Sequence, residues 1–288
     1  MFSQLQQRVF IGERMTNLTR LLSTEQSESG AQRKRRYSRH ADKILSFMAL
    51  HRVAMADQVQ RRFKGIFHSD RMARLHLQTL VEAGDLGIDR VRAVGQPKIY
   101  RITTQCLKRL ANGDSRAPRP NLVRSSTVLG NHLLHELMIT EVGVQVCTAV
   151  QARLDLQLHW MDRFGLIGRP EFVGLIPDFA FLFQHGTGML VCLIEVSCGE
   201  ESPRRLEEKL QHYAAWAGTD LGQSFLTKTY RLFGAAAPRP QFRLVFVVQN
   251  RRTGNDMARL KQTILAGVKS SPDSLRRLWI ANALTGRA

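Results

Sequence analysis

The sequence predicts a two-domain α/β protein, in which a small basic helical domain precedes a larger domain built on a mixed sheet. Its 288 residues suit two domains of ordinary size, and a hydrophobic fraction of 43% is enough for packed cores. The formal net charge of +18 is unevenly placed. Residues 1–125 hold 24 Lys and Arg against 10 Asp and Glu, a net of +14, whereas residues 126–288 hold 18 against 14, a net of +4.

The excess of positive charge indicates a polyanionic partner, either nucleic acid or an acidic membrane. No apolar run reaches the roughly 18 residues that a membrane helix needs. Polar residues also interrupt the first 20 residues, where a signal peptide would have its apolar segment. The four cysteines form no CxxC pair, which favours reduced thiols over a disulfide framework or metal site. We therefore expect a cytoplasmic protein with no membrane partner.

Two polar segments divide the chain into four parts. Residues 1–39 combine a short helix with a flexible arm, which is either a solvated linker or a tracker of phosphates through Arg33, Lys34, Arg35 and Arg36. Residues 112–126 contain two prolines and form a second linker. The parts are therefore an arm (1–39), a small basic domain (40–111), the linker (112–126) and an α/β domain (127–288).

The small domain, residues 40–111, contains three helical patterns followed by a hairpin. Apolar residues recur at helical spacing in 41–51 and in 54–63. Ser69 and Asp70 suit the start of a third helix, which ends at Gly84. Segments 86–94 and 98–103 have strand composition and are joined by Gly-Gln-Pro. The apolar stripe of the third helix is predicted to be Met72, Leu75, Leu77, Leu80 and Val81.

Three helices and a basic hairpin make a winged helix-turn-helix, whose third helix enters the major groove while the wing touches the backbone. Gly84, the turn GQPK and the closing strand YRIT resemble winged-helix domains in general. We expect double-stranded DNA as the partner. An alternative is a winged helix used only for protein contacts. The candidate DNA contacts are Arg71, Arg74, Arg90, Arg92 and Lys98.

The α/β domain contains a hairpin that aligns two acidic residues. Segments 176–183 and 188–196 flank a glycine-containing turn. If the turn is centred between Gly186 and Thr187, opposed residue numbers sum to 373, so Asp178 faces Glu195. Two adjacent carboxylates repel unless a cation or proton lies between them, and oxygen ligands of this kind suit Mg²⁺. Alternatively, the acids are a vestigial pair or are ion-paired with Arg205 and Lys209.

Pro177-Asp178 followed by Glu195-Val196-Ser197 resembles the PD-(D/E)xK nuclease motif. This resemblance implies a restriction-endonuclease-like fold, with Mg²⁺ held by Asp178, Glu195 and an acid on an earlier helix, Glu141 or less favourably Glu136. Ser197 stands where the motif has its catalytic lysine. The resemblance leaves Lys209, on the following helix, as the substitute.

The chain resembles the replication-relaxation family of plasmids and mobile elements in the order of its segments. These are the winged helix, the helix NHLLHELMITEVGV, the strand IPDFAF and the stretch IEVSCGEESPRRLEEKLQHYAAW. The resemblance implies a DNA-binding accessory protein of replication, relaxation or transfer, with replication or transfer proteins as partners. A homodimer is also left open. The alternatives are a Mg²⁺-dependent PD-(D/E)xK endonuclease and a winged-helix transcriptional regulator.

Overall fold

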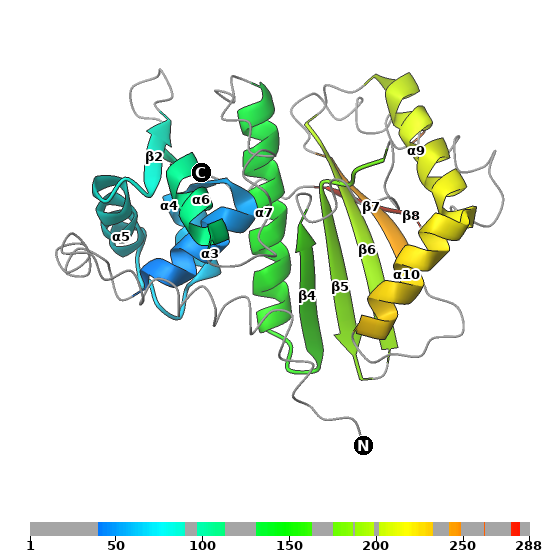
Figure 1. Ribbon diagram of the computed structural model, residues 1–288, viewed down its shortest axis with the longest axis horizontal. Helices are drawn as coiled ribbons and strands as arrows, with labels where there is room; N and C mark the ends of the chain where they lie inside the picture. Colours follow the sequence, from blue (N-terminus) through cyan, green and yellow to red (C-terminus); the bar gives the residue numbers. More distant parts are fainter. Residues whose placement is uncertain are drawn as a thin grey trace. The chain divides into compact units, whose positions relative to one another are not determined.

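The computed structural model forms two compact units, Met1–Thr148 and Ala149–Ala288, and Figure 1 shows their elements. It describes residues 40–89, 97–112, 131–162, 175–186, 188–198, 202–232, 242–248, 262 and 278–282. The predicted arm and most of the predicted linker lie outside this range.

The first unit contains the predicted order of three helices and a hairpin. These are α3 (Ala41–His51), α4 (Ala56–Arg62), α5 (Asp70–Glu82), β2 (Leu86–Asp89) and β3 (Ile99–Ile102). The sequence did not reveal β1 (Val53–Met55), which is too short to show a period of two, or α6 (Thr104–Asn112). The three strands form an antiparallel sheet in the order β1-β3-β2.

The core of the first unit is formed by residues of α3, α4, α5, α6, α7 (Asn131–Gln151) and this sheet. On α5 the buried positions are Ala73, Leu77 and Leu80, which recur at intervals of four and three residues. The prediction that Leu75 belongs to the buried stripe is wrong, because its side chain is 61% exposed. It lies two residues from both Ala73 and Leu77, about 200° around the helix, and so points to the opposite side.

Helix α7 (Asn131–Gln151) belongs to the first unit up to Thr148. The Thr140 hydroxyl donates to the Val53 carbonyl at 2.8 Å, joining α7 to β1. The predicted boundary assigned this helix to the second domain, whereas the first compact unit extends to Thr148. Residues 133–151 of α7 are long and apolar enough to span a membrane. This is weak evidence for a membrane span, because the core helix of a soluble protein passes the same test.

The second unit is an α/β structure with a five-stranded mixed sheet in the order β4-β5-β6-β7-β8. Strands β4 (Leu156–Asp162), β5 (Phe179–His185) and β6 (Gly188–Ser197) pair antiparallel, whereas β7 (Phe242–Val248) and β8 (Leu278–Asn282) continue in parallel. Helices α9 (Pro203–Gly218) and α10 (Asp220–Leu232) follow β6 (Figure 1). The sequence did not predict β4, β8 or α10.

One face of this sheet packs against α9 and α10. Alternate side chains of the central strands, including Leu182, Leu193 and Leu244, form a single core with residues of both helices. Tyr213 and Phe225 are the most deeply buried aromatic residues from the helices. Because Asp178 and Glu195 have the same strand parity as Leu182 and Leu193, both acids belong to the face that α9 covers.

Candidate functional site

The solvent-facing side of α5 carries the exposed residues that the sequence singled out for DNA contact. Ser69 begins the helix as its N-cap, since its hydroxyl accepts from the Met72 N–H at 3.3 Å. Arg71 and Arg74 are both exposed, whereas Gln78 is partly exposed. The Arg74 guanidinium pairs with the Asp70 carboxylate one turn earlier, with its Nε donating at 2.8 Å. Arg71 is therefore the more available cation of the two.

The remaining candidate DNA contacts divide into described and undescribed residues. Lys98 is exposed immediately before β3, on the hairpin that was predicted to be the wing. Three residues later, Arg101 of β3 donates to Asp89 of β2 at 3.0 Å, which ties the two hairpin strands together. The following candidates lie outside the described residues: Arg33, Lys34, Arg35, Arg36, Arg90 and Arg92.

In the second unit, the structure has the β5–β6 register that the turn arithmetic predicted. Phe179 pairs with Ile194 and His185 with Gly188, so every opposed pair sums to 373. Gly186 has φ of 57°, which fits the first position of a tight hairpin turn. Asp178 extends the ladder, because its N–H donates to the Ile194 carbonyl at 2.9 Å. Asp178 and Glu195 are therefore opposed at the end of the hairpin.

Both acids are buried and both accept hydrogen bonds. Asp178 is 7% exposed and accepts from the Val196 N–H at 2.9 Å, while Glu195 is 4% exposed. Two residues of α9 contact Glu195: the Lys209 ammonium donates at 3.0 Å, and the Tyr213 hydroxyl donates to the other carboxylate oxygen. The structure thus brings together Asp178, Glu195 and Lys209, and adds Tyr213.

Burial and the neighbouring negative charge of Asp178 raise the pKa of Glu195 to about 7, although Lys209 and the Tyr213 hydroxyl act in the opposite direction. The cluster combines two carboxylates with one ammonium group. Its chemistry allows it to exchange a proton near neutral pH or to attract a further cation.

The sequence could have revealed Tyr213. It lies four residues after Lys209 on a predicted helix, so the two side chains share a face. Ser197, which stands in the position of the motif lysine, is buried at the end of β6. Arg205, the other proposed ion-pair partner of the acids, is exposed.

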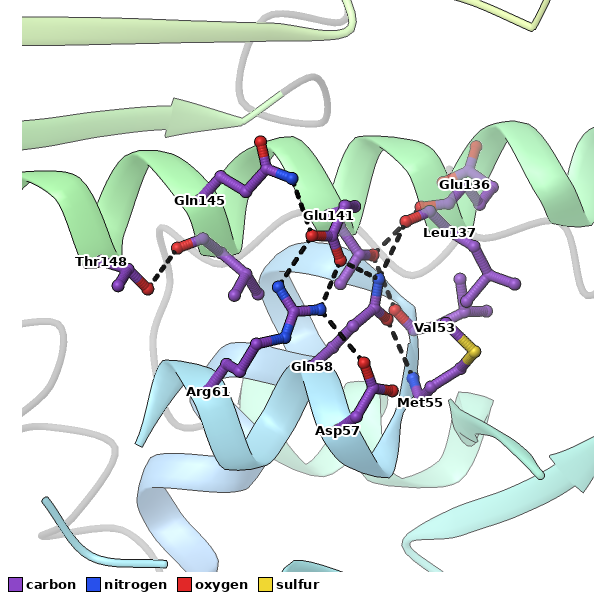
Figure 2. A network of polar contacts seen from close by, with 12 residues as sticks. Val53, Met55, Asp57, Gln58, Arg61, Glu136, Leu137, Glu141, Gln145 and Thr148 are labelled. Carbon is purple, nitrogen blue, oxygen red and sulfur yellow. Dashed lines mark hydrogen bonds and ion pairs between the residues drawn. The ribbon is translucent and has the colours of Figure 1, made fainter. Parts of the chain in front are cut away.

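Glu141, the acid proposed as a third metal ligand, forms a polar network within the first unit (Figure 2). Arg61 of α4 donates two hydrogen bonds to its carboxylate, at 2.7 and 2.6 Å. Gln58 donates to the same carboxylate at 3.1 Å and Gln145 at 2.9 Å. Burial alone would raise the pKa of Glu141, but these hydrogen bonds outweigh it and lower the pKa below its usual value.

The less favoured acid, Glu136, is partly buried one turn earlier on α7, and its backbone carbonyl accepts from the Thr140 hydroxyl at 3.0 Å. Within the described parts of the chain, no three His, Cys, Asp or Glu side chains are grouped so that they could hold a metal ion. A metal at the second unit's cluster would therefore have Asp178 and Glu195 as its described protein ligands.

A family model described as replication-relaxation matches residues 45–227, which is more than half of the chain. The chain belongs to the replication-relaxation family. The match runs from α3 into α10, and thus includes both the α5 surface and the acidic cluster of this family member. Membership indicates a role related to replication or relaxation. No curated protein and no solved structure matches the chain.

Proposed function

We propose that this replication-relaxation protein binds double-stranded DNA through residues 40–111, which act as a winged helix-turn-helix, and that it serves replication, relaxation or transfer of a plasmid or mobile element as an accessory factor. The observation that carries the proposal is the solvent-facing side of α5, where Arg71 and Arg74 are exposed. This helix is the third of three and precedes a hairpin, the position of the recognition helix in winged-helix domains.

The charge distribution supports the same partner. Residues 1–125 carry a net charge of +14, so binding should release counterions and weaken steeply as salt rises. The wing residue Lys98 would contact the phosphate backbone, whereas α5 would contact base edges.

The test is the affinity of the full chain for a fluorescent duplex, measured by anisotropy at several salt concentrations. Changing Arg71 and Arg74 together to Ala should weaken binding about 5- to 150-fold if either makes a bidentate base contact, which corresponds to about 1–3 kcal/mol. Deleting residues 1–125 is a poorer test, because α7 would lose Val53 and Arg61, its partners in the first unit.

The matched control changes Arg204 and Arg205 to Ala on α9. It removes the same charge from an exposed pair, in which Arg204 is bonded to Glu208 one turn later as Arg74 is to Asp70. Binding by this variant should equal that of the wild type. If the two double variants bind duplex equally well, α5 is not the DNA-binding helix.

A second candidate function is favoured by the convergence of Asp178, Glu195 and Lys209: a Mg²⁺-dependent nuclease of the PD-(D/E)xK type. The two carboxylates are hard oxygen donors and would hold the ion together with waters and phosphate oxygens. A bound Mg²⁺ would polarise the phosphate and activate a water. Lys209 would orient that water, although its ammonium already bonds Glu195.

Supercoiled plasmid and Mn²⁺ test this second candidate. Nicking that disappears in Asp178→Asn would support it, as would thermal stabilisation of the wild type by Mn²⁺ that the variant lacks. A flat calorimetric titration without nicking would exclude it and leave the DNA-binding proposal untouched.

A further inference from the structure

Leu75 is a large apolar side chain on the polar face of α5. It is 61% exposed, whereas the helix buries Ala73, Leu77 and Leu80 on its opposite side. Single exposed leucines are common on protein surfaces, so exposure alone implies nothing. The position of Leu75 is what distinguishes it.

Three of the four side chains that lie three or four residues from Leu75 are polar or cationic, and the fourth, Met72, is partly buried against the core. Arg71 lies one turn before it and Gln78 three residues after it, so these side chains share one face with the leucine. Arg74 is adjacent in sequence and also exposed. A protein partner would require several neighbouring apolar side chains to form a dry contact. This face instead combines one exposed apolar side chain, Leu75, with cationic side chains. Such a combination complements a polyanion that carries isolated apolar groups.

Duplex DNA has that combination in its major groove. Thymine presents a 5-methyl group there, beside the acceptor and donor atoms of the base edges, and apolar side chains distinguish thymine through this methyl group. We propose that Leu75 contacts a thymine 5-methyl group and so makes α5 prefer thymine at one position of its site. The inference rests on the proposed DNA-binding function and names the base that this helix selects.

The size of the effect follows from the group that is buried. Removing one methyl group from water is worth about 0.8 kcal/mol, which is about fourfold in affinity. Uracil in place of thymine removes only this methyl group and leaves base pairing and charge unchanged. Leu75→Ala removes the other side of the same contact.

The experiment starts with selection of duplexes from a pool with a random core by the full-length wild-type protein. Each enriched thymine is then replaced by uracil, and affinities are measured by anisotropy. We expect one thymine whose replacement weakens wild-type binding about fourfold. Leu75→Ala should bind the thymine duplex as weakly as the wild type binds the uracil duplex, and should not distinguish the two.

Leu221→Ala is the matched control, because Leu221 is an exposed leucine, 49% accessible, on α10 of the second unit. It should retain the fourfold preference. Both side chains are exposed, so both variants should melt at the wild-type temperature. Wild-type binding that is indifferent to uracil at every position, or a Leu75→Ala variant that keeps the preference, would overturn the inference while leaving DNA binding intact. Failure to bind any duplex would instead refute the proposed function and the inference with it.

Discussion

Replacing Gly143 by Ala should destabilise the first unit, because α7 and α3 are in close contact there. A Cβ at this position would lie 2.4 Å from Cε1 of His51 and 3.2 Å from its Nε2, well inside ordinary van der Waals contact. The imidazole is 2% exposed and its ring centroid is 4.5 Å from that of Phe47, so it has little room to move away.

Two effects of opposite sign determine the magnitude. Ala is favoured over Gly inside a helix by about 1 kcal/mol. Overpacking of a well-packed core costs about 1–3 kcal/mol, and a contact as short as 2.4 Å belongs at the upper end of that range. We expect a net loss of about 1–2 kcal/mol in the free energy of unfolding.

Urea unfolding followed by far-UV circular dichroism measures this loss. Tryptophan emission reports on the second unit, because all three tryptophans lie at or beyond residue 160. Gly218→Ala at the end of α9 is the matched control, since its added Cβ meets nothing within 4 Å. In a His51→Ala background, Gly143→Ala should become neutral or stabilising. A single Gly143→Ala variant as stable as the wild type would refute the packing argument.

Two further predictions concern buried charge. Burial and nearby Arg62 lower the pKa of His51 to about 3, so the first unit should lose stability as pH falls below 6.5. The pKa of Glu195 is raised to about 7, so the second unit should lose stability as pH rises from 4.5 to 7. If the stabilities measured by circular dichroism and by tryptophan emission changed with pH in the same direction, the two pH predictions could not both be correct. Arg61→Ala should cost about 1–3 kcal/mol in urea unfolding, because it leaves the Glu141 carboxylate without its guanidinium partner. The control Arg153→Ala breaks an exposed ion pair with Asp155 and should cost much less. Equal losses would show that the contact with Glu141 adds no stability beyond that of a surface ion pair.

The parts of the structure that depend on local sequence could be predicted. The hairpin register followed from a turn centred on Gly186 and Thr187, because strand pairing on both sides of a tight turn leaves a single choice of opposed residues. Ser69 and Gly84 correctly marked the limits of α5 for the same reason: capping chemistry acts within one helical turn.

The parts that depend on distant contacts could not be predicted. Glu141 was assigned to the second domain, yet its partner Arg61 is 80 residues earlier, and nothing in the local sequence indicates that pairing. Leu75 was assigned to the core because its residue type is apolar, although the helical period places it with Arg71. Strict use of the period would have corrected this assignment and revealed Tyr213.

Lys209→Met distinguishes a structural role of the acidic cluster from a catalytic one. The ammonium is the one cation that we found bonded to Glu195 in the described cluster, and the Lys209 side chain is 34% exposed while that of Glu195 is 5% exposed. Removing it leaves two buried carboxylates whose mutual repulsion is relieved when one of them takes up a proton, so we expect tryptophan-detected stability to fall by about 1–3 kcal/mol above neutral pH and by less in acid. Duplex affinity should not change, because the proposed DNA-binding residues belong to the first unit. An accessory factor would then keep its full binding activity with a weakened second unit, whereas a nuclease would keep binding and lose nicking. If a folded Lys209→Met variant bound duplex more weakly than the wild type, the assignment of DNA binding to the first unit alone would be wrong, because the second unit would then bind DNA as well.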